Sequence, residues 1–213
     1  LLDVAPIGPD YIPGHAHADT LSFEWSLFGQ RVLVNSGISE YGLSEERLRQ
    51  RGTAAHNTVV VSGENSSEVW SGFRVARRAR PFGVRLELTG NGTTVTASHT
   101  GYQRLRPKLT HTREWQVMPG CLQVKDTLAG KFTEAVAYFH FHPGVSVSAE
   151  GECIFLTLPD GHRCEMRVQG GRAVVEGGTW HPEFGLCEAN QRVAVSLEGP
   201  VLETLIRYTD LSF

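Results

Sequence analysis

Two histidines and an aspartate stand at alternate positions in the stretch GHAHADTLSFEW, residues 14–25. In extended backbone, His15, His17 and Asp19 project from the same side of the chain. Neutral imidazoles held close together suit a divalent transition metal, and an adjacent carboxylate can ligate the ion or orient a histidine. The spacing therefore indicates a metal site, a catalytic site or a polar strand end held by hydrogen bonds.

Two further strand ends carry polar residues of the same kind. His56 and Asn57 begin the strand-like run in GTAAHNTVVV, and Asn35 ends the run RVLVN, with Tyr41 shortly after it. Such positions are often gathered into binding sites, because the sheet behind them is rigid. Asn35 and Asn57 also suit turn capping through their own side chains, so a structural role stays open for both.

Alternation of apolar and polar residues dominates the elements that must position these side chains, as in LSFEWSLF, residues 21–28. Similar runs recur along the chain, separated by short turns, and the chain has 23 glycines. This pattern predicts an all-β protein, a large antiparallel β-sandwich of the supersandwich type, in a single domain over residues 1–213. One short helix is expected near residues 44–51, with Ser44 as its N-cap and Gly52 after its end.

The composition excludes two classes of partner. A net charge of −3 does not provide a general basic surface for nucleic acid. No apolar run approaches the roughly 20 residues of a membrane-spanning helix, so no membrane span is expected. Arg51 lies near His56 in sequence and is a candidate for contacting an anionic substrate. The arginines of RVARRAR fit contact with the anionic groups of a glycan and fit a solvated strand equally well. The histidines of YFHFHPG fit a structural strand.

Four cysteines occur without the CxxC spacing of a thiolate metal site. If Asp160 and Gly161 form a two-residue hairpin turn, Cys164 faces Thr157 and not Cys153. A hairpin disulfide is therefore excluded by register, and free thiols are expected.

The blocks PGHAHADTLSFEW, GQRVLVNSGISEYG and RGTAAHNTVVVSGENSSEVWSGFRVARRARP, within residues 13–81, resemble the heparinase II/III-like family, in particular its C-terminal β-sandwich domain. The resemblance implies a polysaccharide lyase acting on an acidic polysaccharide that contains uronic acid, such as heparan sulfate or alginate. Such enzymes cleave by β-elimination, which needs a base, an acid for the leaving oxygen and neutralisation of the uronate carboxylate.

The resemblance also implies roles for individual residues. His15 falls at the family's catalytic histidine, and Tyr41 lies near a catalytic tyrosine of some members. His17 and His56 fall at metal ligands, with zinc as the expected ion. Asn35 stands where the family commonly has a ligating aspartate, which removes a negative charge from the site.

Three residues complete the expected site. Asp19 is expected to orient the histidines from the second layer. Arg51 and Asn57 are candidates for binding the substrate carboxylate.

The family usually places an N-terminal α/α-toroid before this domain, so a helical domain in cis is expected as a partner and the isolated chain is expected to be weakly active or inactive. The resemblance further implies a bacterial protein in the periplasm or elsewhere outside the cytoplasm. A rival interpretation is a non-catalytic module for glycan binding or exopolysaccharide assembly, which Asn35 favours. A cupin-type metal enzyme is disfavoured, because the first glutamate after the histidine pair is as distant as Glu24.

Overall fold

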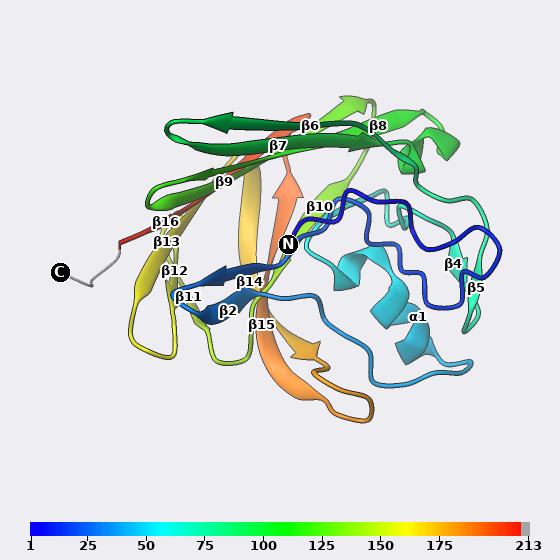
Figure 1. Cartoon of the computed structure of the whole chain (residues 1–213), viewed down its shortest axis with the longest axis horizontal. Coiled ribbons are helices and arrows are strands. Elements are labelled where there is room, and N and C mark those ends of the chain that lie inside the picture. Colours follow the sequence, from blue (N-terminus) through cyan, green and yellow to red (C-terminus); the bar gives the residue numbers. More distant parts are fainter. Residues whose placement is uncertain (210–213) are drawn as a thin grey trace.

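The structure, a computed structural model, describes residues 1–209 and consists mainly of antiparallel β-strands (Figure 1). Eight strands form the larger sheet. In spatial order they are β11 (Ser146–Glu150), β12 (Cys153–Thr157), β13 (Arg163–Gln169), β16 (Val201–Tyr208), β9 (Cys121–Gly130), β8 (Leu109–Met118), β7 (Gly92–His99) and β6 (Pro81–Thr89).

A four-stranded sheet packs against this larger one. Its spatial order is β14 (Gly171–Trp180), β15 (Glu188–Leu197), β10 (Ala135–His140) and β3 (Val59–Val61). Two short ribbons complete the sheets, formed by β1 (Trp25–Leu27) with β2 (Gln30–Leu33) and by β4 (Val69–Trp70) with β5 (Arg74–Val75). The predicted all-β antiparallel sandwich is confirmed.

Large apolar side chains from both sheets fill the space between them. Phe139 of β10 and Trp115 of β8 are buried, and Phe23 packs edge-on against each ring at centroid distances of 6.4 Å. The alternation in the sequence explains this arrangement, because β8 buries every second residue from Leu109 to Trp115. Burial of one such side chain contributes about 1.5–3 kcal/mol.

The hairpin between β12 and β13 differs from the expected register by one residue. Cys164 pairs with Leu156, and Cys153 pairs with Arg167. The turn has one residue more than expected, because the backbone N–H of Leu158 donates to the carbonyl of His162 and so continues the ladder. The expected free thiols are confirmed, since all four cysteines are unpaired.

The predicted helix is present as α1 (Glu45–Arg51). Ser44 caps it, with Oγ accepting a hydrogen bond from the backbone N–H of Arg47 at 3.0 Å. Two short 3-10 helices are also present, η1 (Thr53–Ala55) and η2 (Gly101–Arg104). No helix in the described residues is long and apolar enough to cross a membrane.

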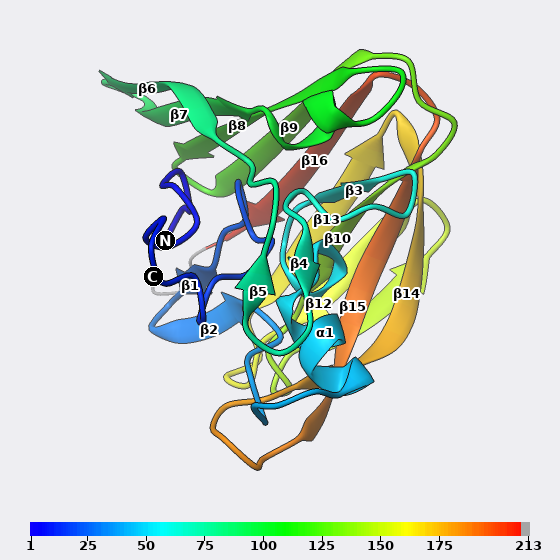
Figure 2. The same cartoon turned by 90° about the vertical axis from the view of Figure 1, so that its right-hand side faces the viewer.

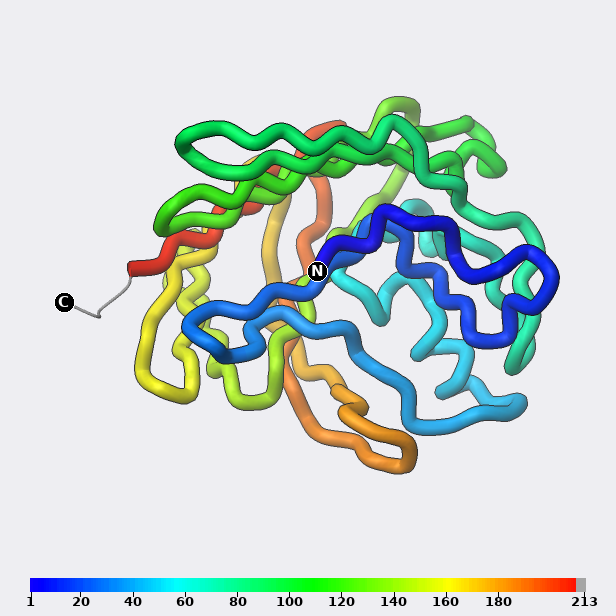
Figure 3. Tube along the Cα trace, viewed as in Figure 1, coloured from blue at the N-terminus to red at the C-terminus, as the bar shows by residue number. Residues whose placement is uncertain are grey.

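The N-terminal segment, residues 1–24, runs as extended loops beside the segment that contains α1 (Figures 2 and 3). The backbone N–H of Ala18 donates to the carbonyl of Arg51 at 2.8 Å, and Arg51 Nε donates to the carbonyl of Ala16 at 3.0 Å. These bonds hold the histidine motif of residues 14–20 against the C-terminal end of α1.

Candidate active site and metal centre

One buried amide joins the segments that carry the candidate residues. Asn57 Nδ2 donates to the carbonyls of Phe23 and Val34 at 2.7 and 3.1 Å, and its Oδ1 accepts from the backbone N–H of His140 at 2.6 Å. Every hydrogen bond of this amide is therefore made to backbone. This network fixes the backbone at Phe23, after β2 and at the end of β10 relative to the segment that leads into β3.

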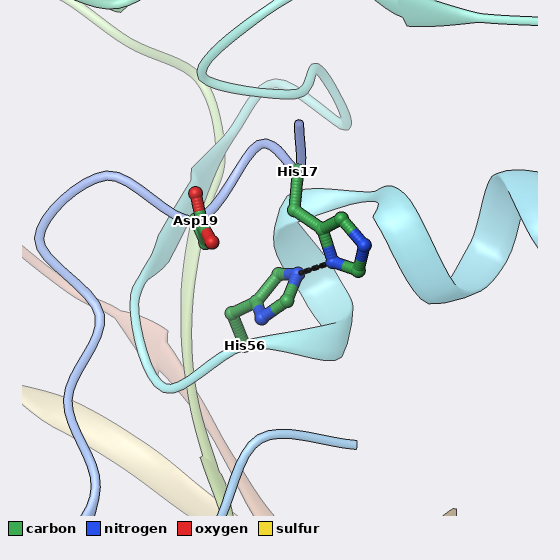
Figure 4. A group of neighbouring side chains, drawn as sticks. All are labelled: His17, Asp19 and His56. Carbon is green, nitrogen blue, oxygen red and sulfur yellow. Dashed lines mark hydrogen bonds between the residues drawn. The ribbon is translucent and has the colours of Figure 1, made fainter. Parts of the chain in front are cut away.

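The three predicted metal ligands His17, Asn35 and His56 lie together in the structure, and Figure 4 shows the two histidines beside Asp19. His17 Nδ1 is 3.2 Å from His56 Nε2, and His56 Nδ1 is 3.2 Å from Asn35 Oδ1. Because an amide oxygen only accepts, His56 donates from Nδ1 and accepts at Nε2. His17 therefore donates from Nδ1 in this arrangement.

Both histidines are held in the neutral form. Burial lowers the pKa of His17 to about 4, with smaller effects from the charges of Arg47 and Arg51. Burial also lowers the pKa of His56, and the neighbouring His17 adds to this effect. Two neutral imidazoles with facing nitrogens at this separation fit a zinc-type ion, which binds neutral histidine and lies about 2.0–2.1 Å from each nitrogen.

Asp19 lies beside the histidine pair and is largely shielded from solvent. Burial, together with the charge of Asp3, raises the pKa of its carboxyl group to about 7. One oxygen of Asp19 and one ring nitrogen from each of His17 and His56 all lie within 4.8 Å of one another. The group therefore supplies a donor set of nitrogen and oxygen atoms suited to a divalent ion.

The two predicted catalytic residues also meet. Tyr41 Oη is 3.3 Å from His15 Nδ1, and the two rings pack edge-on with centroids 5.5 Å apart. Both side chains are exposed, and that of Tyr41 is 48% accessible. This pair offers two proton carriers on an open surface, within hydrogen-bonding reach of each other.

Arg51 and Asn57 take positions that differ from the expected substrate contacts, because neither is exposed. Arg51 donates to the backbone carbonyls of Ala16, Ser71 and Arg74 at 3.0, 3.0 and 3.3 Å. Asn57 is likewise committed to backbone groups. Both side chains hold the loops of the site in place, and their burial keeps them from a substrate on the surface.

Sequence reasoning missed Arg47. It is fully buried on α1, with its guanidinium carbon 5.1 Å from the ring centre of Tyr41, and it donates to the carbonyl of Gly72 at 3.2 Å. Its signal in the sequence is its spacing of four residues from Arg51, which puts both on one helix face. Among residues 1–209, no carboxylate forms an ion pair with either arginine, so the site has two buried positive charges beneath it.

Phe73 and Phe184 were also missed. Their ring centroids lie 5.8 and 5.2 Å from that of Tyr41, and both are exposed, at 45% and 62%. Phe184 belongs to the loop between β14 and β15, so nothing in the sequence near Tyr41 indicates its presence.

The remaining candidates have structural surroundings. His140 is buried and its Nε2 donates to the carbonyl of Ala54 at 2.9 Å, which agrees with the structural interpretation of its strand. In the arginine-rich segment, Arg77 pairs with Glu68, and Arg78 pairs with Asp10.

The family model described as heparinase II/III-like, C-terminal, matches residues 1–209. The chain belongs to the heparinase II/III-like C-terminal family. The resemblance seen in the sequence is thereby confirmed. The candidate site lies within the matched range, on segments that precede most of the two sheets.

Two solved structures share the fold of this heparinase II/III-like domain. A mutant of the heparan sulfate lyase HepC from Pedobacter heparinus is 18% identical, with a TM-score of 0.76 over 98% of this chain and 32% of that chain. The heparinase III BT4657 gene product with methylated lysines is 17% identical, with a TM-score of 0.76 over 100% of this chain and 35% of that chain. The chain thus spans about a third of each. Comparison with curated proteins gave no match.

Proposed function

We propose that this chain is the β-sandwich part of a polysaccharide lyase that cleaves uronic-acid-containing polysaccharide by β-elimination. The observation that carries the proposal is the exposed pair of His15 and Tyr41, with Nδ1 and Oη 3.3 Å apart. Family membership supports a role in polysaccharide cleavage. An extracytoplasmic or periplasmic location of a bacterial protein forms part of the same proposal.

The pair supplies both proton transfers of the reaction. His15, as a neutral imidazole, accepts the C5 proton of the uronate, while Tyr41 donates its hydroxyl proton to the glycosidic oxygen that leaves C4. The electrons of the C5–H bond form the C4–C5 double bond, and the C4–O bond breaks. The contact between Oη and Nδ1 then lets the histidine return its proton to the tyrosinate, which regenerates the starting state.

The buried arginines favour an anionic substrate at this place. Arg47 lies under the Tyr41 ring, and Arg51 follows one helical turn later, both without a paired carboxylate in the described residues. Their charges stabilise negative charge that develops on the uronate carboxylate during proton abstraction, since a low-dielectric setting weakens screening. Neither guanidinium touches the substrate.

The metal centre belongs to the same proposal. His17 and His56 would hold a zinc-type ion together with an oxygen donor, and the ion would supply positive charge to the site. The neutral state of the two imidazoles prepares this chain for that role, because no proton has to leave an imidazolium first.

A helical domain in cis would supply the rest of the substrate cleft. The chain spans 32% and 35% of the two lyase structures that share its fold, so those proteins are long enough to include such a domain. The exposed rings of Phe73 and Phe184 next to Tyr41 provide a surface that a cleft wall or a sugar ring can cover.

The experiment follows release of unsaturated uronate by absorbance, using heparan sulfate and alginate with the full-length protein. Tyr41→Phe and His15→Ala are each expected to lower kcat about 100-fold or more, because each removes one proton carrier. Tyr138→Phe on β10 is the matched control and is expected to leave kcat unchanged. Equal rates for Tyr41→Phe and wild type would contradict the proposal.

The rival function is glycan binding or exopolysaccharide assembly without elimination, which the neutral Asn35 favours. It predicts that the full-length protein binds acidic oligosaccharide in calorimetry and releases no unsaturated product. The Tyr41→Phe protein would then bind as wild type does.

A further inference from the structure

The two ring nitrogens of His56 face different partners. Nε2 lies 3.2 Å from Nδ1 of His17, whereas Nδ1 lies 3.2 Å from Oδ1 of Asn35. The lone pairs of the two nitrogens of one imidazole diverge strongly. An ion shared by His56 Nε2 and His17 therefore lies on the side of the ring away from Asn35.

Asn35 occupies the position of an outer partner, a residue that hydrogen-bonds a ligating histidine and does not touch the ion. A histidine that ligates a metal usually donates its other ring N–H to a carboxylate or carbonyl oxygen, which fixes its tautomer and orientation. Asn35 Oδ1 accepts from Nδ1 of His56 in this way. The amide thus leaves Nε2 free to act as the ligand.

The oxygen donor on the side of the histidine pair is Asp19. One of its carboxylate oxygens lies within 4.8 Å of one ring nitrogen of His17 and of His56 (Figure 4). The carboxylate is largely buried, and no arginine or lysine among residues 1–209 forms an ion pair with it. A buried carboxylate without a cation gains most from a bound positive ion.

We propose that a divalent ion of the zinc type is bound by His17, His56 and Asp19, and that Asn35 orients His56 without ligating the ion. Asp19 then supplies the negative charge that the amide of Asn35 lacks. Ligand atoms about 2.1 Å from a tetrahedral ion lie about 3.4 Å apart, so the 3.2 Å separation of the two ring nitrogens already suits coordination. On binding, His17 has to carry its proton on Nε2 in place of Nδ1, and the carboxylate of Asp19 has to approach. The inference builds on the metal centre of the proposed function.

Zinc binding to the full chain, measured by calorimetry, tests the assignment without lyase activity. Asp19→Asn is expected to lower the affinity at least about 100-fold, whereas Asn35→Ala is expected to lower it about 10-fold, as an outer partner does. Glu203→Gln removes a carboxylate of β16, outside the ligand group, and is the control, with unchanged affinity expected. Near-ultraviolet circular dichroism checks that each variant is folded.

Exchanging the charges of residues 19 and 35 further distinguishes ligation by Asp19 from ligation by Asn35. With cobalt(II) as a spectroscopic probe, Asn35→Asp is expected to keep the absorption bands of wild type, and the double variant Asp19→Asn/Asn35→Asp is expected to stay as weak as Asp19→Asn. Recovery of wild-type affinity in the double variant would overturn the proposal, as would wild-type affinity in Asp19→Asn or no zinc binding by wild type. If Asp19→Asn does not fold, loss of binding in Asn35→Ala overturns it and retention supports it.

Discussion

His111 Nε2 donates a hydrogen bond of 2.6 Å to Asp126 Oδ1 in the interior of the eight-stranded sheet, where neither side chain is exposed. Arg113 completes this group, because its Nε lies 2.7 Å from the same oxygen and its Nη1 donates to the carbonyls of Leu21 and Asn57. Burial opposes ionisation of Asp126, but Arg113 and His111 outweigh it and lower its pKa to about 2. A buried ion pair on β8 and β9 thus supports the loops that carry His17 and His56.

Removal of the Asp126 charge is expected to destabilise the fold strongly. Asp126→Asn leaves Arg113 buried and unpaired, which costs about 3–5 kcal/mol in the free energy of unfolding. Glu203→Gln breaks the partly exposed Lys125–Glu203 pair on the neighbouring strands and is expected to cost less than about 1 kcal/mol. Urea denaturation of both variants measures the difference, and equal losses would contradict the structural role of the buried pair.

Acid is expected to destabilise the protein through His140. Its pKa is lowered to about 4 by burial, although the hydrogen bond to Ala54 acts in the other direction. The unfolded chain, with a histidine pKa of about 6.5, therefore binds the proton more tightly, and stability falls as the pH drops from 6.5 towards 4, by up to about 3 kcal/mol.

The variant His140→Gln isolates this effect. Its amide can still donate to the carbonyl of Ala54 but does not titrate, so the loss of stability between pH 6.5 and pH 4 is expected to be smaller than in wild type. Urea denaturation across this range measures it, with the half-buried His142→Gln as control. Identical pH dependence of His140→Gln and wild type would show that His140 does not carry the effect.

Arg47 is expected to increase the proposed lyase activity and not to increase the free energy of unfolding. Desolvation lowers its pKa, and Arg47→Met removes a buried charge that no carboxylate within residues 1–209 compensates. The variant is expected to unfold at the same or a higher urea concentration, while kcat/KM on acidic polysaccharide falls about 10-fold as the field near Tyr41 is lost. Arg74→Met, which removes an exposed arginine over Trp70, is the control and should leave kcat/KM unchanged.

The cap of α1 is expected to contribute to the stability of the fold. Ser44→Ala removes the bond from Arg47 N–H to Ser44 Oγ and is expected to cost about 1 kcal/mol, whereas Ser44→Thr keeps the acceptor. Thermal unfolding compares the two, and equal melting temperatures would show that the cap contributes little.

Much of the fold could be predicted from sequence because its signals are local. Alternating residues in β8 and the Ser44 cap of α1 act within a few positions, and both predictions were confirmed. The turn between β12 and β13 was predicted one residue too short, since Asp160-Gly161 is a turn signal that fits loops of more than one length.

The candidate site could be predicted only as a set of residue types. The motifs indicated five site residues, and the structure brings them into two groups: His15 with Tyr41, and His17 with His56 and Asn35. The sequence does not state which nitrogen of an imidazole faces which neighbour, because that depends on side-chain rotation in the folded chain. The sequence also does not state whether a polar side chain donates to backbone carbonyls, as Arg51 does, or is accessible to a ligand.

The amide of Asn57 preorganises the candidate site for ligand binding. Because this single side chain ties the backbone at Phe23, Val34 and His140 together, the candidate residues are held in position by the paired sheets before any ligand arrives. The conformational entropy of these loops is lost during folding, so binding does not carry that cost. Exchange of the hydrogen-bonded amides of Ala18, Val34 and Ser36 should accordingly be slow in the free protein and change little on ligand addition.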